Sequence, residues 1–255
     1  MILKYFLWKE KGNWGKWVIK DSIHKYPITL ITLITSFLII NVTNGFDKKV
    51  QEANKHQLKF FPIGDSYTIG EGTTPDLSWP ALLAKHLTNS GIAVNLVANP
   101  SRTGFTTQNA IDIELPLFIK SKPDFATLLI GVNDWVQGID EKTFRKNLVY
   151  LIDEMQKAMS DKSKFLFVTI PDFSAAPSGN QYARGRNISD GLKHFNDIIK
   201  EEAAKRNLPV VDVFDLSKAM SQDASLVAGD GLHPSAKEYA LWEGKILPVV
   251  MNMLK

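Results

Sequence analysis

Three short clusters of residues have the side chains needed for chemistry through a serine nucleophile. Gly64-Asp65-Ser66 follows an apolar run, Asn133 lies between Gly131 and Asp134, and Asp230 lies three residues before His233. A serine hydroxyl is a weak nucleophile until a neutral imidazole accepts its proton, so Ser66 needs a histidine. Asp230 can accept a hydrogen bond from Nδ1–H of His233, which leaves Nε2 facing the serine. An asparagine side chain can donate to the oxygen that becomes negative during acyl transfer. The ordered set predicts a serine hydrolase.

Each cluster also has a purely structural interpretation. Gly64-Asp65-Ser66 alone would suit a strand-to-helix turn in which Ser or Asp caps the helix. Asp230 alone could cap a turn, and Asn133 could be a turn residue. Asp134 is expected to hold its loop in place. The presence of all three clusters in one chain favours the catalytic interpretation.

The region 58–255 alternates apolar strands with amphipathic helices. The sequence predicts strands at 58–63, 93–98, 125–130, 165–170 and 209–214, and helices at 79–88, 107–120, 141–159, 189–206 and 235–254, the last bent near Pro248. The run 125–130 is almost continuously apolar, which is typical of a strand buried on both faces of a parallel sheet. Strands joined by helical crossovers predict a doubly wound parallel sheet with helices on both faces. Sites in such sheets form at the carboxyl ends of the strands, where Ser66 and Asn133 fall.

Four ordered blocks resemble those of the GDSL/SGNH hydrolases, over roughly residues 60 to 242. The blocks are Gly64-Asp65-Ser66-Tyr67, Gly104 within Ser101-Arg102-Thr103-Gly104-Phe105, Gly131-Val132-Asn133-Asp134 and Asp230-Gly231-Leu232-His233. Tyr67 departs from the Leu that ends one family name, and we expect it to pack. The chain also lacks the Gly-x-Ser-x-Gly elbow of the ordinary α/β-hydrolases, which disfavours that related fold.

The resemblance implies a flavodoxin-like three-layer α/β/α sandwich with a five-stranded parallel sheet, preceded here by an N-terminal hydrophobic helix. It implies that Ser66 is the nucleophile, His233 the base and Asp230 the residue that orients the base. The Ser66 amide, the Gly104 amide and the Asn133 side chain would form the oxyanion hole. Glycine at 104 would bring its N–H to the oxygen without a Cβ in the way, although a turn could also require it.

The activity implied is that of an esterase, which cleaves a lipid-like or small acyl ester through an acyl-Ser66 intermediate and needs neither a metal nor an organic cofactor. Two alternatives stay open. An acyltransferase would use the same triad, with an alcohol outcompeting water, and a flavodoxin-like binding module would keep the motifs for the fold alone. The intact Ser66, Asp230 and His233 set counts against the module, because binding does not need all three.

Two groups of aromatic and loop residues leave their roles open. Trp79 and Trp135 lie close to the catalytic blocks in sequence, and each could line an acyl pocket or pack in the core. The Pro-, Ser- and Gly-containing loop 171–186 could overhang the site or remain a plain solvent loop. The remaining histidines, at positions 24, 56, 86 and 194, are scattered and are expected on the surface or in packing contacts.

The amino-acid composition of the chain narrows the classes of partner and cofactor. The net charge is +3, from 30 Lys and Arg against 27 Asp and Glu, which is too balanced to indicate nucleic-acid binding. The chain contains 0 Cys. This excludes disulfides, thiolate catalysis, cysteine-ligated zinc and lipid attachment through an N-terminal Cys.

The N-terminal region differs from the rest of the chain. Residues 1–25 form a basic segment, residues 26–46 carry no charge, residues 47–57 form a polar linker, and residues 58–255 form the hydrolase domain. As a helix, 26–46 would span ~31 Å, about one hydrocarbon core. Lysines ahead of it predict an uncleaved signal anchor with the catalytic domain on the extracytoplasmic side. A cleaved signal peptide followed by secretion is the first alternative. The second is a soluble, cytoplasmic extension whose Thr29, Thr32 and Thr35 share a helical face.

Overall fold

The computed structural model describes residues 6–10, 13–17 and 57–255. The chain divides into two compact units, Met1–Lys55 and His56–Lys255. In the first unit, β1 (Phe6–Glu10) pairs antiparallel with β2 (Asn13–Trp17). The expected membrane segment 26–46, and the linker up to residue 56, lie outside the described residues. Within the described part of the chain, no helix combines the length and apolar character needed to cross a membrane.

The second unit is built on a five-stranded parallel sheet, as the sequence predicts. Its strands are β3 (Leu58–Gly64), β4 (Val94–Leu96), β5 (Phe125–Leu129), β6 (Phe165–Val168) and β7 (Val210–Val211). They lie in the order β4-β3-β5-β6-β7. Counted within this sheet the order is 2-1-3-4-5, that of flavodoxin-like folds, in which the crevice lies where the first and third strands meet. β3 and β5 therefore mark the expected site.

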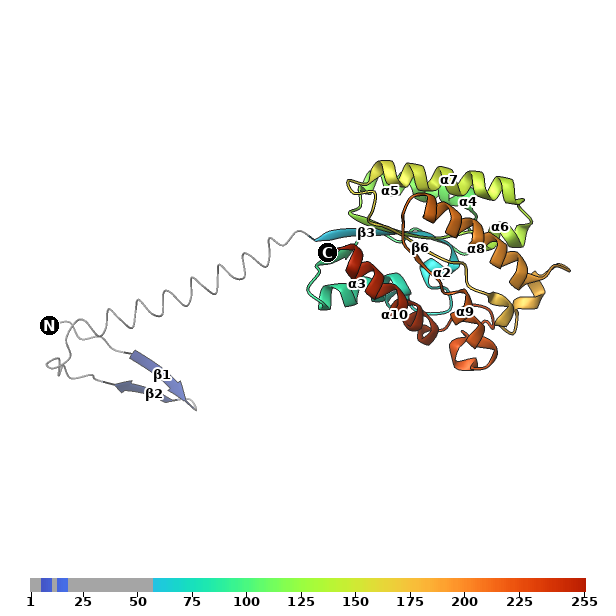
Figure 1. Cartoon of the computed structure of the whole chain (residues 1–255). Coiled ribbons are helices and arrows are strands. Elements are labelled where there is room, and N and C mark those ends of the chain that lie inside the picture. The colour runs from blue at the N-terminus through green and yellow to red at the C-terminus, as the bar shows by residue number, and fades with distance from the viewer. Residues whose placement is uncertain (1–5, 11–12, 18–56) are drawn as a thin grey trace. The chain divides into compact units, whose positions relative to one another are not determined.

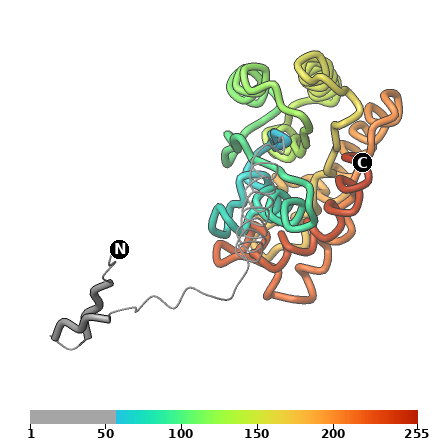
Figure 2. The backbone as a smooth tube through the Cα atoms, turned by 90° about the vertical axis from the view of Figure 1, so that its left-hand side faces the viewer, coloured from blue at the N-terminus to red at the C-terminus, as the bar shows by residue number. Residues whose placement is uncertain are grey.

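Helices cover both faces of the sheet (Figure 1). They are α2 (Ser66–Ile69), α3 (Trp79–Asn89), α4 (Thr107–Asn109), α5 (Leu115–Ser121), α6 (Val132–Gln137), α7 (Glu141–Ala158), α8 (Ile188–Lys205), α9 (Phe214–Ser217) and α10 (Ala236–Met253). α3 and α10 pack together on one face, whereas α5, α7 and α8 cover the other. Figure 2 looks nearly along α5, in green, and α7, in yellow, which lie side by side. The three-layer sandwich is confirmed.

Short helical turns fill several of the connections. The 3₁₀ turns are η1 (Pro75–Leu77), η3 (Phe173–Ala175), η4 (Gly179–Tyr182), η5 (Lys218–Ser221) and η6 (Ala224–Leu226). η3 and η4 lie within the loop 171–186. α7 and α8 begin at side-chain caps, where Asp140 accepts from the Thr143 N–H and Asn187 from the Asp190 N–H. α10 continues through Pro248 to Met253.

The core strands follow from their apolar runs. All residues of β5 and β6 are buried, as expected for central strands of a parallel sheet. Phe60 on β3 and Phe125 on β5 occupy paired positions, and their rings stack with centroids 4.5 Å apart. The edge strands β4 and β7 are shorter than the runs 93–98 and 209–214. β7 ends at Val211, and the carboxylate of the next residue, Asp212, accepts from the Thr169 hydroxyl and the Phe214 N–H and so turns the chain.

The prediction of one continuous helix over 107–120 is wrong. The run 107–120 is not a single α-helix, because η2 (Ala110–Glu114) is a π-helical segment between α4 and α5. A π-segment adds a residue to one helical turn and shifts the face that every later side chain presents. Ala110, Glu114 and Phe118 are buried as a consequence, and an acidic side chain joins two apolar ones in the interior.

Candidate active site

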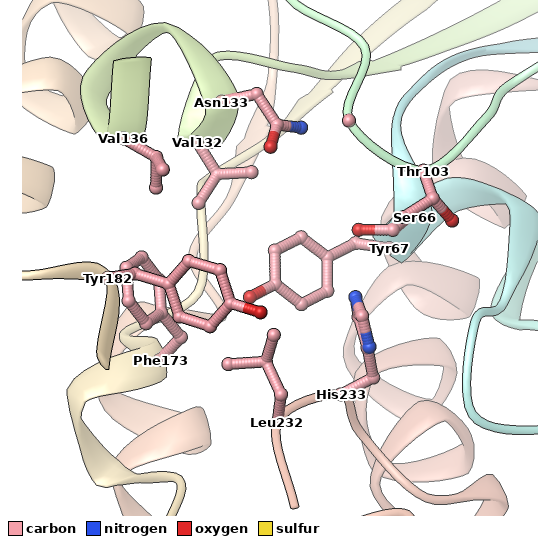
Figure 3. A pocket seen from close by; sticks show the side chains of 11 residues that line it. Ser66, Tyr67, Thr103, Val132, Asn133, Val136, Phe173, Tyr182, Leu232 and His233 are labelled. Carbon is pink, nitrogen blue, oxygen red and sulfur yellow. The ribbon is translucent and has the colours of Figure 1, made fainter. Parts of the chain in front are cut away.

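A pocket of about 200 Å³ opens at the carboxyl ends of β3 and β5. Four of the five candidate site residues line it: Ser66, Gly104, Asn133 and His233. They come from four separate segments of the chain, and the fifth residue, Asp230, contacts the His233 ring from behind. Figure 3 shows one nitrogen of the His233 ring turned towards the Ser66 hydroxyl across the mouth of this pocket. The structure thus brings all five predicted residues to one place.

Ser66 is the first residue of α2, directly after the sharp turn that ends β3. Neighbouring atoms crowd position 64. A Cβ there would lie 2.1 Å from Oγ1 of Thr68 and 2.5 Å from the carbonyl oxygen of Leu129, so only glycine fits. Asp65 caps α2, with Oδ1 accepting from the Tyr67 N–H at 3.0 Å. These contacts place the Ser66 side chain and its amide at the pocket surface, although only 5 % of the residue is exposed.

Asp230 and His233 form a compact acid–base pair on a single turn before α10. Oδ2 of Asp230 lies 2.6 Å from Nδ1 of His233, while Oδ1 accepts from the backbone N–H groups of Leu232 and His233 at 2.9 and 3.0 Å. Partial burial alone would raise the pKa of Asp230, but these hydrogen bonds outweigh it and lower the pKa below its usual value. The aspartate is therefore an ionised acceptor that fixes the orientation of the ring.

The turn itself is held against the rest of the domain. The Ala228 N–H donates to the His233 carbonyl oxygen at 2.8 Å, and Val227 and Pro234 form an isolated antiparallel bridge. The imidazole packs edge-on against Tyr67, with ring centroids 5.8 Å apart. His233 is therefore positioned from both its backbone and its ring.

Asn133 and Gly104 face the same side of the pocket. Nδ2 of Asn133 donates to the Phe105 carbonyl oxygen at 2.9 Å. A side-chain amide carries two N–H donors, so one remains for a ligand. Gly104 has φ +85, a conformation that favours glycine, and a Cβ there would find nothing within 4 Å. The backbone conformation of this loop, rather than crowding by the protein, is thus what calls for glycine at 104.

The rest of the pocket is mainly apolar. Val132 and Val136 come from α6, Phe173 and Tyr182 from the loop 171–186, and Leu232 from the turn before His233. This loop therefore overhangs the site, one of the two alternatives that the sequence leaves open. The Tyr67 ring crosses the pocket, with its hydroxyl pointing towards the Tyr182 side of the cavity (Figure 3).

Arg186 joins the two walls of the pocket. Its guanidinium group donates to the carbonyl oxygens of Trp135 and Val136, at 2.6 and 3.0 Å, where α6 ends. It also lies 4.0 Å from the centroid of the Trp135 ring. Trp135 in turn packs against Phe173. Trp135 thus supports the pocket wall from behind, and Trp79, which is fully buried and donates to the Tyr67 carbonyl oxygen, is a core residue.

Three carboxyl groups near Ser66 are buried, and one of them, Glu114, lies outside the predicted blocks. Burial raises the pKa of Asp65 and of Glu114 to about 8, against opposing hydrogen bonds from backbone N–H groups. Burial also raises the pKa of Asp134, whose carboxylate accepts from the N–H and the hydroxyl of Thr107 and so holds the start of α4. The signal for Glu114 was an acidic residue on an otherwise apolar helical stripe.

The other described histidines lie away from the pocket. His86 pairs with Glu243 at 3.0 Å, and His194 pairs with Glu141 at 2.9 Å. Among the described residues, no group of three or more His, Asp or Glu side chains is placed to hold a metal ion.

The sequence and fold match known esterases. The family model of the GDSL-like lipase/acylhydrolase family matches residues 63–241. Esterase TesA of Pseudomonas aeruginosa is 24% identical over 176 residues, which cover 68% of this chain and 78% of that protein.

Solved structures share the fold. A lipase/acylhydrolase from Enterococcus faecalis is 26% identical, with a TM-score of 0.62 over 77% of this chain and 96% of its own. Axe2, an acetyl xylan esterase from Geobacillus stearothermophilus, is 20% identical, with a TM-score of 0.59 over 76% of this chain and 94% of its own. The family match spans all four blocks of the pocket from Ser66 to His233. The chain therefore belongs to the GDSL-like lipase/acylhydrolase family and is a serine ester hydrolase.

Proposed function

We propose that the chain hydrolyses carboxylic esters of short acyl groups through an acyl-Ser66 intermediate. The observation that carries this proposal is the meeting of Ser66, Gly104, Asn133 and His233 at one small pocket, with Asp230 hydrogen-bonded to the far side of His233. A nucleophile, a base with its orienting acid, and three oxyanion donors are the parts that the proposed acyl transfer uses.

The reaction runs in two steps, acylation of Ser66 and its deacylation by water. Nε2 of His233 takes the hydroxyl proton as Oγ of Ser66 attacks the ester carbonyl carbon, and the tetrahedral oxyanion accepts hydrogen bonds from the amides of Ser66 and Gly104 and from Nδ2 of Asn133. The C–O bond to the alcohol breaks, and His233 returns the proton to the leaving alkoxide. Water then attacks the acyl-serine with the same base, which releases the carboxylic acid and restores Ser66.

The pocket dimensions favour a short acyl group. At about 200 Å³ it is smaller than the ~300–1,000 Å³ typical of pockets for drug-sized ligands. Its apolar walls, from Val132, Val136, Phe173 and Leu232, suit an alkyl chain, and Tyr182 stands across their far side. The acetyl xylan esterase named above, which shares the fold, acts on an acetyl ester. We therefore expect acetyl to butyryl esters to be cleaved faster than decanoyl or palmitoyl esters.

The nucleophile is tested with an alkyl fluorophosphonate, which forms a stable bond to an activated serine. We expect one equivalent of label on Ser66, found by peptide mass spectrometry, and a matching loss of ester hydrolysis. Ser66→Ala should take no label and lose about 10⁴-fold or more in kcat, with its thermal unfolding nearly unchanged. Ser90→Ala, at an exposed serine that ends α3, serves as the matched control and should behave as wild type.

For wild type, Ser66→Ala and Ser90→Ala, kcat/KM is measured with each ester from acetyl to palmitoyl. Labelling of a serine other than Ser66, or full activity in Ser66→Ala, would overturn the nucleophile. A rate that rises steadily up to palmitoyl esters would overturn the short-acyl assignment and leave the nucleophile standing. Added methanol that diverts the acyl group to a methyl ester would reveal acyl transfer as a competing outcome.

We also propose, on the sequence of residues 26–46 alone, that this stretch anchors the domain to a membrane with the catalytic domain on the extracytoplasmic side. Its support is the uncharged run that follows a lysine-rich segment. Full-length protein should then pellet with membranes, resist carbonate extraction and lose its catalytic domain to protease added to spheroplasts. Recovery of the full-length chain in the soluble fraction would refute the anchor.

A further inference from the structure

Glu114 connects the two backbone segments that carry the proposed oxyanion donors. Its Oε1 accepts from the Gly64 N–H at 3.2 Å and from the Ser101 hydroxyl at 3.0 Å. Gly64 lies two residues before Ser66, and Ser101 lies three residues before Gly104. A single carboxyl oxygen thus holds the end of β3 beside the loop of Gly104.

The π-segment η2 is what directs this side chain inwards. Glu114 is the last residue of η2 (Ala110–Glu114) and is 0 % exposed, although Asp112 and Ile113 next to it face solvent. π-Segments of this kind are rare and frequently occur at functional sites. The extra residue in the turn allows a glutamate from the helical layer to reach the edge of the sheet.

The surroundings of Glu114 keep its carboxyl group neutral. Oε2 of Glu114 and Oδ2 of the neighbouring Asp65 are both buried, and neither has a hydrogen-bond partner within the described residues. Burial is the main reason that the pKa of each rises to about 8, and the Asp65 charge adds to the effect on Glu114. No cation pairs with Glu114 among the described residues. A buried, unpaired carboxylate is far costlier than a neutral acid, so the protonated form is favoured.

The groups that face Glu114 can be named element by element. Asp65 faces it from the end of β3, and Asp134 on α6 acts in turn on Asp65. On β3, Lys59 is at the opposite end and donates to the Ser121 carbonyl oxygen at 3.0 Å. The charged side chains of α5 and α7 are exposed or half-exposed, as is Asp112 on η2 itself.

From this geometry we propose that Glu114, as a neutral carboxylic acid, is a positioning residue of the oxyanion hole and sets the alkaline limit of activity. The inference rests on the proposed function of the same site. When the acid ionises, the new charge faces Asp65 with no cation beside it, and the two segments that Glu114 joins are pushed apart. A displacement of about 1 Å at reacting groups can cost about 10²-fold in rate, so even a small shift of these amides matters.

The test compares Glu114→Gln and Glu114→Leu in the full-length chain. Gln keeps an acceptor at Oε1 and cannot ionise, whereas Leu leaves the Gly64 N–H and the Ser101 hydroxyl without a buried acceptor. The test determines kcat and KM for an acetyl ester between pH 5 and 10 by following acid release. Glu114→Gln should retain most of the kcat at pH 7 and move the alkaline fall to higher pH by about half a unit or more, because an amide at position 114 cannot ionise. Glu114→Leu should lose about 10²-fold in kcat with little change in KM.

Glu238→Gln is the matched control. Glu238 is also fully buried, its Oε1 accepts from Trp242 at 2.8 Å, its Oε2 has no partner within the described residues, and burial raises its pKa. It lies on α10, away from both oxyanion segments, so Glu238→Gln should keep the wild-type pH profile. An unmoved alkaline limb in Glu114→Gln would overturn the inference.

A readout without catalysis separates this inference from the proposed function. Between pH 6 and 9 the thermal unfolding midpoint of wild type should fall more steeply than that of Glu114→Gln, whatever the enzyme hydrolyses. Equal slopes would refute the neutral acid. Loss of all Ser66-dependent hydrolysis from wild type with unequal slopes would instead refute the proposed function and leave the charge state of Glu114 standing.

Discussion

At the scale of single residues, the acid–base pair is the most sharply defined part of the site. Asp230 uses both carboxylate oxygens, one for the ring of His233 and one for two backbone N–H groups of the same turn. The side chain therefore shapes the turn as well as orienting the ring. A substitution that keeps the shape but changes the hydrogen-bond chemistry separates these two effects.

Asp230→Asn is that substitution. An amide at this position can donate to Nδ1, which would place the ring proton on Nε2 and remove the lone pair that Ser66 needs. We expect kcat to fall by about 10⁴-fold with the fold retained. Steady-state kinetics and circular dichroism would measure the two effects. Glu141→Gln, which alters the exposed pair of Glu141 with His194, is the control and should leave kcat unchanged.

Asn133→Ala tests the proposed side-chain donor of the oxyanion hole. Loss of one such donor costs about 2.7–4 kcal/mol of transition-state stabilisation, so kcat should drop by about 10²–10³-fold while KM changes little. Asn187→Ala is the control, since Asn187 caps α8 and its loss should cost only about 1 kcal/mol of unfolding free energy. A defect of Asn133→Ala confined to KM would show that Asn133 binds the ground-state substrate instead.

The acid side of the pH profile belongs to His233. A general base accepts a proton only in its unprotonated form. We therefore expect kcat/KM for a short acyl ester to fall towards acid pH. A rate that stays constant from pH 8 down to pH 5 would contradict a histidine base.

At the scale of secondary-structure elements, Arg186 determines how α6 meets the overhanging loop. Its two hydrogen bonds reach carbonyl oxygens in the last turn of α6, where the Trp135 oxygen also accepts from the Gly138 N–H. The loop residues Phe173 and Tyr182 and the helix residues Val132 and Val136 are thereby held as opposite walls. The dimensions of the pocket depend on this connection.

Arg186→Met should loosen the two walls without touching the catalytic residues. We expect KM for short acyl esters to rise, the preference for short chains to weaken, and the unfolding free energy to fall by about 1–3 kcal/mol. The ester series and urea unfolding measure these changes. Arg206→Met removes another arginine between two elements, the pairs with Asp153 and Glu202, and should lower stability without changing chain-length preference.

The elements also show how far the sequence leads. Alternation of apolar runs predicts the five strands, their parallel arrangement and the helices between them, because burial on both faces leaves a clear pattern in β5 and β6. It overestimates β4 and β7, since an edge strand pairs on one side only and its ladder ends where the chain turns away. It also misses η2, because an extra residue in one helical turn leaves the apolar composition unchanged.

The sequence likewise predicts some residues of the site and misses others. Motif spacing leads to Ser66, Asn133 and His233, because these residues must end up at one sheet edge. It does not lead to Tyr182 or Arg186, whose roles depend on how a loop folds back over the pocket. Contacts between segments far apart in sequence have no local pattern to reveal them.

At the scale of the whole molecule, the buried acids make stability depend on pH. The folded chain holds protons on Asp65 and Glu114 up to about pH 8, whereas the unfolded chain releases them near the ordinary values of 3.8 and 4.5. Between these limits the folded state binds more protons, so the unfolding free energy decreases as pH rises.

We therefore expect the contribution of these two acids to stability to decline from about pH 5 to about pH 8 and to level off above that. The measurement is the difference in urea-unfolding free energy between wild type and Asp65→Asn/Glu114→Gln across this range. A wild-type advantage that grows with rising pH would contradict buried neutral acids.

The position of the acid–base turn along the chain has a consequence for synthesis. Ser66, Gly104 and Asn133 leave the ribosome well before Asp230 and His233, and the turn that holds the pair is followed by α10, which packs against α3. On the proposed mechanism, a nascent chain thus carries its nucleophile and oxyanion donors through most of translation without a base to activate them. We therefore expect a chain that ends before Asp230 and His233 to have no esterase activity.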